Sequence, residues 1–294
     1  MSWPDAQHGW VIADRGDIIA TADGGVTWTQ QASGLGLLRS LDFIDANRGF
    51  AGSLSGKLYR TTNGGATWVD ITSTMGRTPI GFCGITHVGN TVHVVGRYQG
   101  ATDYFVSRDG GDTWEYSNLG ALIQGMVDIA FVNDSVGFIG GTGNSTVPNQ
   151  GPATILKTTD GGRNWRIVHV DGGLRGWAWK VFIIDANVIY TALESTDGIY
   201  RVVKSVDGGE YWDTQIVATG QPLGTAGGIQ GIGFLDANVG WVGGFFTGMY
   251  ATTNGGLTWS KVSVTSANIN RYRRAGSTLF TAGTKGVLRY DPHP

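Results

Sequence analysis

Short apolar runs alternate with polar, glycine-rich turns along the whole chain, and this pattern predicts strands rather than helices. Runs such as LDF, IAF, VFII and IGF each end at a turn of the Asp-Ala-Asn type, and most of these turns lead into a second apolar run such as GFAG or GWVGG. Runs of this length between Gly, Asn and Asp are typical of antiparallel strands. The turns occupy residues 5–10, 45–50, 133–138, 185–187 and 236–241.

A polar octet with two central glycines occurs six times, and each copy ends on tryptophan. The copies are residues 21–28 (TADGGVTW), 61–68 (TTNGGATW), 107–114 (SRDGGDTW), 158–165 (TTDGGRNW), 205–212 (SVDGGEYW) and 252–259 (TTNGGLTW). Asp-Gly or Asn-Gly between β-forming runs predicts a hairpin, because these residues accept the positive φ of a tight turn. The tryptophans recur every 40 to 51 residues, a period typical of propeller blades.

The two repeats together define blades of four strands, A to D. The Asp-Ala-Asn turn joins A to B, a variable loop joins B to C, and the octet joins C to D. The sequence therefore predicts one all-β domain over residues 1–294, a seven-bladed β-propeller with an incomplete seventh blade. The predicted blades are about 1–34, 35–76, 77–121, 122–173, 174–222, 223–266 and 267–294.

The first and last blades lack residues for a full set of strands. Blade 7 has three strand-like runs and no octet, and blade 1 has only Met1 to Trp3 for strand A. Three explanations stay open: a strand removed with a leader, a strand supplied by another chain, or a three-stranded blade. The first and third are favoured. No secretory signal is present in the sequence, so we expect a periplasmic, lumenal or extracellular location only if a leader was trimmed.

Composition argues against several functional classes. The 49 glycines and the 15% of charged residues indicate a turn-rich sheet protein. A net charge of −2 gives no bulk attraction to nucleic acid, and no apolar run is long enough for a transmembrane helix. Cys83 is the lone cysteine, and the DGG turns lack the alternating acidic ligands of calcium loops. We therefore expect neither a metal nor a cofactor.

Strand order places the octets and the Asp-Ala-Asn turns on one face, and the B–C loops and D–A connections on the other. Variable loops are where function is expected. Arginine binds carboxylates, and a neighbouring aromatic ring can stack on a ligand; the alternative is that these arginines pair locally or cover apolar strands with their stems. The candidate binding residues are Arg39, Arg77, Arg97, Tyr98, Arg175, Trp177, Trp179, Lys180, Glu194, Arg271, Arg273 and Arg274.

The octets resemble the Asp-box, or BNR repeat, S/T-x-D-x-G-x-T-W. The phrases GFAG…GKLYRTTNGGATW and GWVGG…GMYATTNGGLTW are similar to blades of the photosystem II stability/assembly factor family and its bacterial relatives. That resemblance implies a seven-bladed, non-catalytic scaffold that binds a protein partner through an arginine-rich patch. We expect this chain to be a binding or assembly scaffold that engages a protein, possibly acidic, through the face opposite the octets.

The alternative is a glycan-binding or glycoside-hydrolase module on a cell or virus surface, since sialidases share the Asp-box. Resemblance to sialidases stops at that box, and their arginine triad is not identifiable here. Glycoside hydrolysis needs two carboxyl groups about 5–10 Å apart. Glu194 could pair with Asp103, Asp128 or Asp197, and the sequence prefers none of them. An enzyme is therefore the less favoured interpretation.

Overall fold

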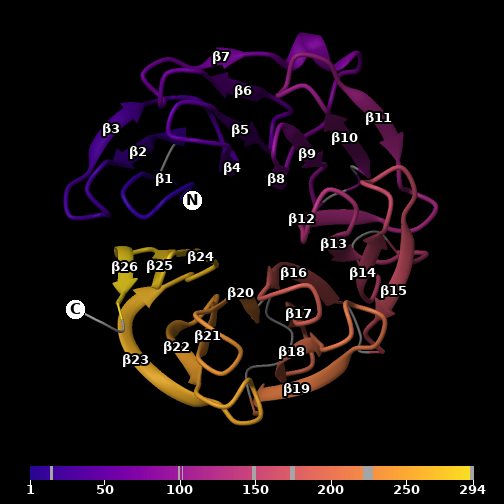
Figure 1. The fold of residues 1–294 in the computed structure, drawn as a ribbon. Coiled ribbons are helices and arrows are strands. Elements are labelled where there is room, and N and C mark those ends of the chain that lie inside the picture. The colour runs from indigo at the N-terminus through magenta and orange to yellow at the C-terminus, as the bar shows by residue number, and fades with distance from the viewer. Residues whose placement is uncertain are drawn as a thin grey trace.

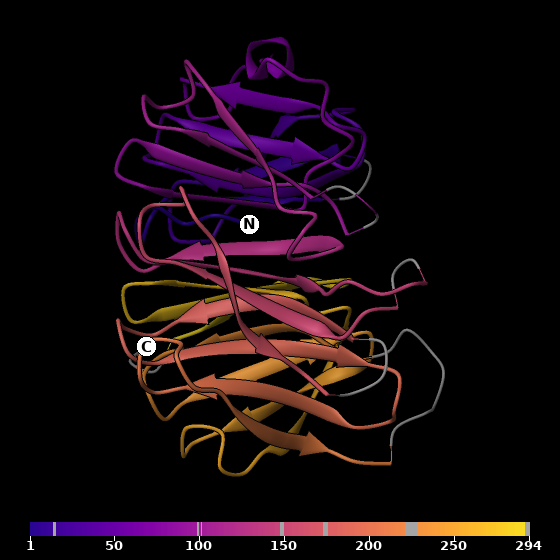
Figure 2. The same ribbon diagram turned by 90° about the vertical axis from the view of Figure 1, so that its right-hand side faces the viewer.

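The computed structural model describes residues 1–13, 16–98, 100, 102–147, 150–172, 176–220 and 228–291. Seven antiparallel sheets follow one another around a central axis (Figure 1). Seen from the side, the strands of the blades run across the thickness of the disc (Figure 2). The predicted all-β seven-bladed propeller is confirmed.

Each blade is one sheet whose strands are hydrogen-bonded in chain order. The bounds are β1 (Gly9–Ile12), β2 (Ile18–Thr21) and β3 (Thr29–Ala32) in blade 1; β4 (Leu38–Phe43), β5 (Gly49–Ser53), β6 (Leu58–Thr61) and β7 (Val69–Asp70) in blade 2, followed by the 3₁₀ turn η2 (Thr72–Met75); β8 (Gly84–Val88), β9 (Thr91–Val95), β10 (Asp103–Ser107) and β11 (Glu115–Asn118) in blade 3; β12 (Gly125–Phe131), β13 (Gly137–Thr142), β14 (Ala153–Thr158) and β15 (Arg166–Val170) in blade 4; β16 (Gly176–Ile183), β17 (Ile189–Ser195), β18 (Tyr200–Ser205) and β19 (Asp213–Ala218) in blade 5; β20 (Ile229–Phe234), β21 (Gly240–Gly244), β22 (Thr247–Thr252) and β23 (Ser260–Ala267) in blade 6; β24 (Arg271–Ala275), β25 (Thr278–Gly283) and β26 (Gly286–Tyr290) in blade 7.

The octet turns and the A–B turns lie on the same face of the disc. In each of blades 1 to 6, the first octet glycine donates its amide to a carbonyl of the A–B turn in the same blade. The pairs are Gly24 to Gln7, Gly64 to Asn47, Gly110 to Asn90, Gly161 to Ser135, Gly208 to Asn187 and Gly255 to Asn238. Because both turns of a blade are tied together, the B–C loops and D–A connections are left at the opposite face.

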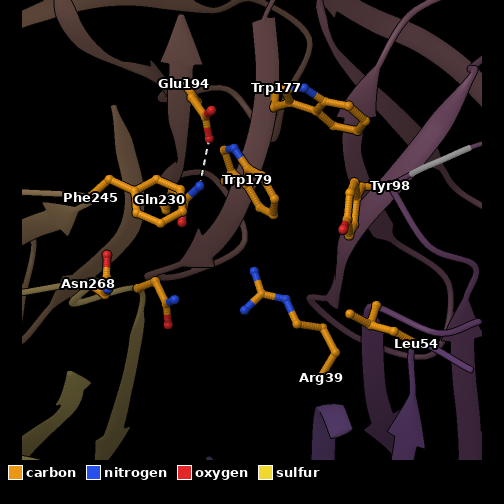
Figure 3. A pocket seen from close by; sticks show the side chains of 10 residues that line it. Arg39, Leu54, Tyr98, Trp177, Trp179, Glu194, Gln230, Phe245 and Asn268 are labelled. Carbon is orange, nitrogen blue, oxygen red and sulfur yellow. Dashed lines mark hydrogen bonds between the residues drawn. The ribbon is translucent and has the colours of Figure 1, made fainter. Parts of the chain in front are cut away.

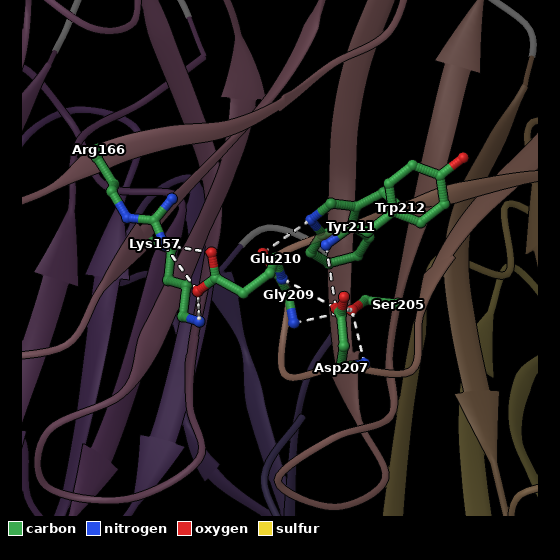
Figure 4. Close-up of polar contacts among 8 residues, drawn as sticks. All are labelled: Lys157, Arg166, Ser205, Asp207, Gly209, Glu210, Tyr211 and Trp212. Atoms are coloured by element: carbon green, nitrogen blue, oxygen red, sulfur yellow. Dashed lines mark hydrogen bonds and ion pairs between the residues drawn. The ribbon is translucent and has the colours of Figure 1, made fainter.

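The octet of blade 5 illustrates how each turn is held (Figure 4). Asp207 accepts the amides of Glu210 and Tyr211, and the Ser205 hydroxyl accepts the Gly209 amide. Gly209 has φ of 86°, and a Cβ there would lie 2.4 Å from Phe138 of the preceding blade, so only glycine fits. Glu210 is also bound by two cations of blade 4, Lys157 at 2.5 Å and Arg166 at 2.7 Å.

Aromatic rings join successive blades. A ring on strand B of one blade stacks on a ring at the end of strand A of the next, with centroid separations of 3.6–4.1 Å: Trp10 on Phe43, His93 on Phe131, Tyr190 on Phe234, and Phe280 on Trp3. The tryptophan of each octet then packs edge-on against a ring of its interface, as Trp68 does against Phe43. Such pairs add about 0.5–1.5 kcal/mol beyond simple burial.

The ring closes between blades 7 and 1 by the same stacking. Ser2 forms a β-bridge with Trp10, so the residues before β1 lie in the position of a strand A. Trp3 stacks on Phe280 of β25 at 3.6 Å, and Trp28 meets Trp3 edge-on. Blade 7 has three strands within the described residues, and the explanations given for its incomplete set stay open.

We expect Phe280→Ala to destabilise the protein by about 3–5 kcal/mol, because it removes the buried ring that joins blade 7 to blade 1. Chemical denaturation gives the free energy of unfolding. The control is Val26→Ala, since Val26 is 73% exposed and its truncation should change stability by less than about 0.5 kcal/mol. An equally small effect of Phe280→Ala would show that this stack does not close the ring.

Candidate binding pocket and channel

A β-bulge recurs near the start of strand A and positions several candidate side chains. The register of strands A and B shifts by one residue in blades 2, 4, 5 and 6. The inserted residues are Arg39, Val127, Trp179 and Gln230, each four positions before the end of its strand. A bulge re-aims a side chain, and here it brings Arg39, Trp179 and Gln230 to one cavity.

The cavity has a volume of about 520 Å³ and lies at the channel mouth on the face of the B–C loops and D–A connections. Trp177 and Trp179 lie with ring centroids 5.8 Å apart, and Tyr98 is 6.1 Å from Trp177 and 6.3 Å from Trp179. Figure 3 shows the Arg39 guanidinium pointing toward the Trp179 ring, whose centroid is 5.5 Å from the guanidinium carbon. The other lining residues are Leu54, Glu194, Gln230, Phe245, Asn268 and Asn270.

Glu194 is a buried carboxyl group in the wall of this pocket. It lies opposite Trp177 in the β16–β17 pair, and Gln230 Nε2 donates to it at 2.7 Å. Burial raises the pKa of Glu194, although the hydrogen bond from Gln230 and the charge of Arg39 oppose that shift. The carboxyl group therefore offers a ligand either a hydrogen-bond acceptor or, when protonated, a donor.

Below the pocket, charged side chains line the channel. Asp128 is 2% exposed and lies 3.4 Å from Lys180 Nζ and 2.9 Å from Arg271 Nη1. Burial alone would raise the pKa of Asp128, but Lys180, Arg271 and Arg273 outweigh it and keep the pKa low. Asp42 is paired with His87 at 2.7 Å. Lys180, Arg271 and Arg273 therefore all interact with Asp128, and Arg273 also interacts with Asp42.

The structure brings Arg39, Tyr98, Trp177, Trp179 and Glu194 together in the pocket, with Lys180 and Arg271 beneath them in the channel. Arg97 lies beside it and donates to the Leu54 carbonyl. The remaining candidates are separated from the pocket or lie outside the described residues, as follows.

Arg274 does not lie on the pocket's rim. It donates to the carbonyl of Leu235, beside the A–B turn of blade 6, because residues 271–275 form strand β24 and so extend along the channel. Arg273 and Arg274 line a second cavity, at the mouth of the channel opposite the pocket, together with Asp42 and His87. Arg77 packs on Tyr116 of the outer strand β11, at 4.6 Å from the ring centroid. Arg175 lies outside the described residues.

Sequence reasoning missed Gln230, Phe245, Asn268 and Asn270 as pocket residues. Gln230 could have been found by aligning the A strands, because it occupies the bulge position of Arg39 and Trp179. The carboxylates considered as partners of Glu194 have other roles. Asp103 accepts from Tyr116, Asp197 binds Arg201, and Asp128 binds Lys180 and Arg271.

These features define a seven-bladed β-propeller with a pocket of mixed aromatic and polar side chains at one mouth of a cationic channel. Among the described residues, no group of three or more His, Cys, Asp or Glu side chains is arranged to hold a metal ion. No helix in the described part of the chain has the length and apolarity needed to span a membrane.

Comparison with known structures supports the fold. A structure described as YCF48 bound to D1 peptide matches 99% of this chain and 90% of its own, with TM-score 0.72 and 18% identity. YCF48 from Cyanidioschyzon merolae matches 99% of this chain and 94% of its own, with TM-score 0.69 and 21% identity. The resemblance to the photosystem II assembly factor propeller is therefore confirmed at the level of fold.

A GH74 xyloglucanase from Xanthomonas campestris is also similar, with TM-score 0.64 and 14% identity over 96% of this chain. The chain spans only half of that enzyme. No family model and no curated protein matches the sequence.

The channel predicts a pH-dependent stability that a single substitution should reveal. The pKa of Lys180 is lowered from 10.5 to about 7, chiefly by burial; Asp128 opposes this shift, and Arg271 and Arg39 contribute to it. Between about pH 7 and 10.5 the unfolded chain holds more protons than the folded one, so rising pH favours folding.

We therefore expect the unfolding free energy of the wild type, minus that of Lys180→Met, to increase from pH 7 to pH 10. Denaturation curves at several pH values measure this difference, and the other titrating groups largely cancel in it. Below about pH 6 the difference should level off. A difference independent of pH would show that Lys180 keeps its ordinary pKa.

Proposed function

We propose that this propeller is a non-catalytic scaffold that binds an extended protein segment at the channel mouth. The observation that carries this proposal is the pocket itself, where Trp177, Trp179 and Tyr98 stand beside the Arg39 cation. Aromatic walls bind apolar side chains, and a guanidinium binds a carboxylate through paired hydrogen bonds. One segment with an apolar and an acidic side chain would satisfy both.

The channel below the pocket favours an acidic ligand. Arg271 and Arg273, and below about pH 7 also the Lys180 ammonium, interact with Asp128, and Arg273 interacts with Asp42 as well. These groups are buried, and charges interact more strongly there than in bulk water. A ligand carboxylate entering from the pocket would therefore meet Arg39 in the pocket and Arg271 beneath it, although the whole chain has a net charge of −2.

The likeness to a YCF48 structure bound to D1 peptide supports a peptide ligand, because that protein shares the fold over nearly the whole chain. The octets, interpreted as Asp-boxes, contribute to the scaffold and not to this site, since their turns are tied to the A–B turns on the opposite face.

A glycan-binding function is the second candidate, and the two indole rings that line the pocket favour it. Glu194, Gln230, Asn268 and Asn270 could hydrogen-bond sugar hydroxyl groups around a ring stacked on Trp177. Hydrolysis needs a second carboxyl group, whereas Glu194 is the only residue with a carboxyl group among the described residues that line the pocket. We therefore consider a lectin as the alternative.

Peptides selected from a random phage-displayed library should lose affinity in two pocket variants. Trp177→Ala should weaken binding by about thirtyfold, because a central interface tryptophan contributes on the order of 2 kcal/mol. Arg39→Gln should weaken binding and also flatten its salt dependence, because the paired charge is lost. Fluorescence anisotropy at two salt concentrations measures both effects.

The control is Tyr211→Ala, since Tyr211 is 67% exposed on the octet face and should not affect binding. A glycan array tests the second candidate with the same proteins. Carbohydrate binding that depends on Trp177 and is insensitive to salt would favour the lectin. Peptide selection that yields no sequence dependent on Trp177 or Arg39 would rule out the proposed scaffold site.

A further inference from the structure

The channel has a second mouth on the octet face, and the cavity at that mouth is lined by charged side chains. This octet-face cavity has a volume of about 270 Å³, and its lining residues belong to β4, β8, β12, β16 and β24. These strands surround the channel (Figure 1). Pockets for drug-sized molecules usually measure about 300–1,000 Å³, so this cavity suits a smaller ligand.

Strand β24 brings two arginines to the octet-face cavity, Arg273 and Arg274. Arg274 is exposed, whereas Arg273 is partly buried. Within the described residues each donates to one backbone carbonyl, Arg273 Nη1 to that of Tyr272 at 3.0 Å and Arg274 Nη1 to that of Leu235 at 2.9 Å. A guanidinium has five N–H donors, so most donors of both side chains remain available to a ligand.

The two carboxylates that line this cavity are bound to other groups. Asp42 Oδ2 lies 2.7 Å from His87 Nδ1, and Asp128 Oδ1 lies 2.9 Å from Arg271 Nη1. Burial works against a charge on His87, but the hydrogen bond and the charge of Asp42 outweigh it and raise the pKa of His87. Each carboxylate therefore already has a basic partner close to it.

The two arginines have no such partner. Within the described residues neither of them forms an ion pair, although Asp128 and Asp42 act on Arg273 from farther away. Burial and the charge of Arg271 lower the pKa of Arg273 to about 10, so this guanidinium is still charged at neutral pH. A buried charge without a close counter-ion costs free energy, and an anionic ligand would offset that cost.

We propose that the octet-face cavity binds a phosphate group, held by the guanidinium groups of Arg273 and Arg274. The planar fork of an arginine can donate two parallel hydrogen bonds to phosphate oxygens. A phosphate group carries more charge and more acceptor oxygens than a carboxylate, so it can engage both arginines at once. Thr86, in the same wall, offers its hydroxyl group as a further donor.

This site is separate from the pocket that we propose for a protein segment. The two cavities lie at opposite mouths of the channel and share no lining residue. A phosphate group at Arg273 and Arg274 therefore leaves the pocket open, and the test of either site does not decide the other.

The probe is inorganic phosphate, titrated into the full chain at an ionic strength held constant with chloride. Isothermal titration calorimetry should show saturable binding with a dissociation constant below about 1 mM. Phosphate should also raise the melting temperature, because it binds the folded state. Acetate should bind at least about tenfold more weakly, since it has one charge and two oxygens.

Glycerol 3-phosphate distinguishes the two sources of a phosphate group. An affinity equal to that of inorganic phosphate would identify a phosphate ester as the ligand, and a weaker affinity would identify free phosphate. Either result supports the site, provided that binding depends on the two arginines.

Arg274→Gln should weaken phosphate binding at least about tenfold and change the melting temperature little, because Arg274 is exposed. Arg273→Gln should abolish both binding and the rise in melting temperature with phosphate. The matched control is Arg163→Gln on the octet face. Arg163 is also exposed and donates through Nη1 to a backbone carbonyl, that of Asp160 at 2.9 Å, and its replacement should leave phosphate binding unchanged.

Three results would overturn the proposal. The first is no saturable binding up to about 10 mM phosphate, and the second is acetate binding as tightly as phosphate. The third is equal affinity in the wild type, Arg273→Gln and Arg274→Gln. A loss of the same size in Arg163→Gln would also overturn it, because binding would then follow the total charge of the chain and not this cavity.

Discussion

Ring packing between neighbouring blades is the interaction on which the rest of this structure depends. A blade cannot bury both of its faces alone, and each interface here is closed by rings from both sides, as with Trp10, Phe43 and Trp68. These rings approach so closely because glycines stand beside them. A Cβ at Gly49 would lie 2.7 Å from the Phe43 ring. The abundance of glycine therefore follows from aromatic packing as much as from the turns.

This packing assigns different roles to the two faces of the disc. The octets and A–B turns stabilise the blades through hydrogen bonds such as that from the Gly208 amide to the Asn187 carbonyl. In the described part of the opposite face no turn of this kind is repeated, so its loops can differ from blade to blade. The bulge in strand A serves that face, because it inserts one residue whose identity changes from Arg39 to Trp179 to Gln230 without altering the strands below.

The fold was predictable because the residues within each repeated element determine the conformation of that element. Asp207-Gly208-Gly209 specifies its turn, and six copies at one period specify the ring. The pocket was predictable only in part. Trp177, Trp179 and Tyr98 stood out by residue type. Arg271 and Arg274 are only three residues apart in sequence, but they lie at different levels of the channel because they belong to one strand that runs along it. Gln230 reaches the pocket through a shift in the register of β20 and β21, and this shift cannot be inferred from residue type alone.

The charges in the channel are not required by the fold. The position next to the bulge, or its equivalent in blade 7, is Ser40 in blade 2, Asp128 in blade 4, Lys180 in blade 5, Gly231 in blade 6 and Arg271 in blade 7. Ser40 and Gly231 show that a small or uncharged residue satisfies the same strand geometry. Burying ions costs free energy that their attraction only partly restores, so the packing of the blades does not account for Lys180, Arg271 and Asp128. The proposed binding of an acidic segment beside Arg39 would give the buried cations Lys180 and Arg271 a role that the packing does not.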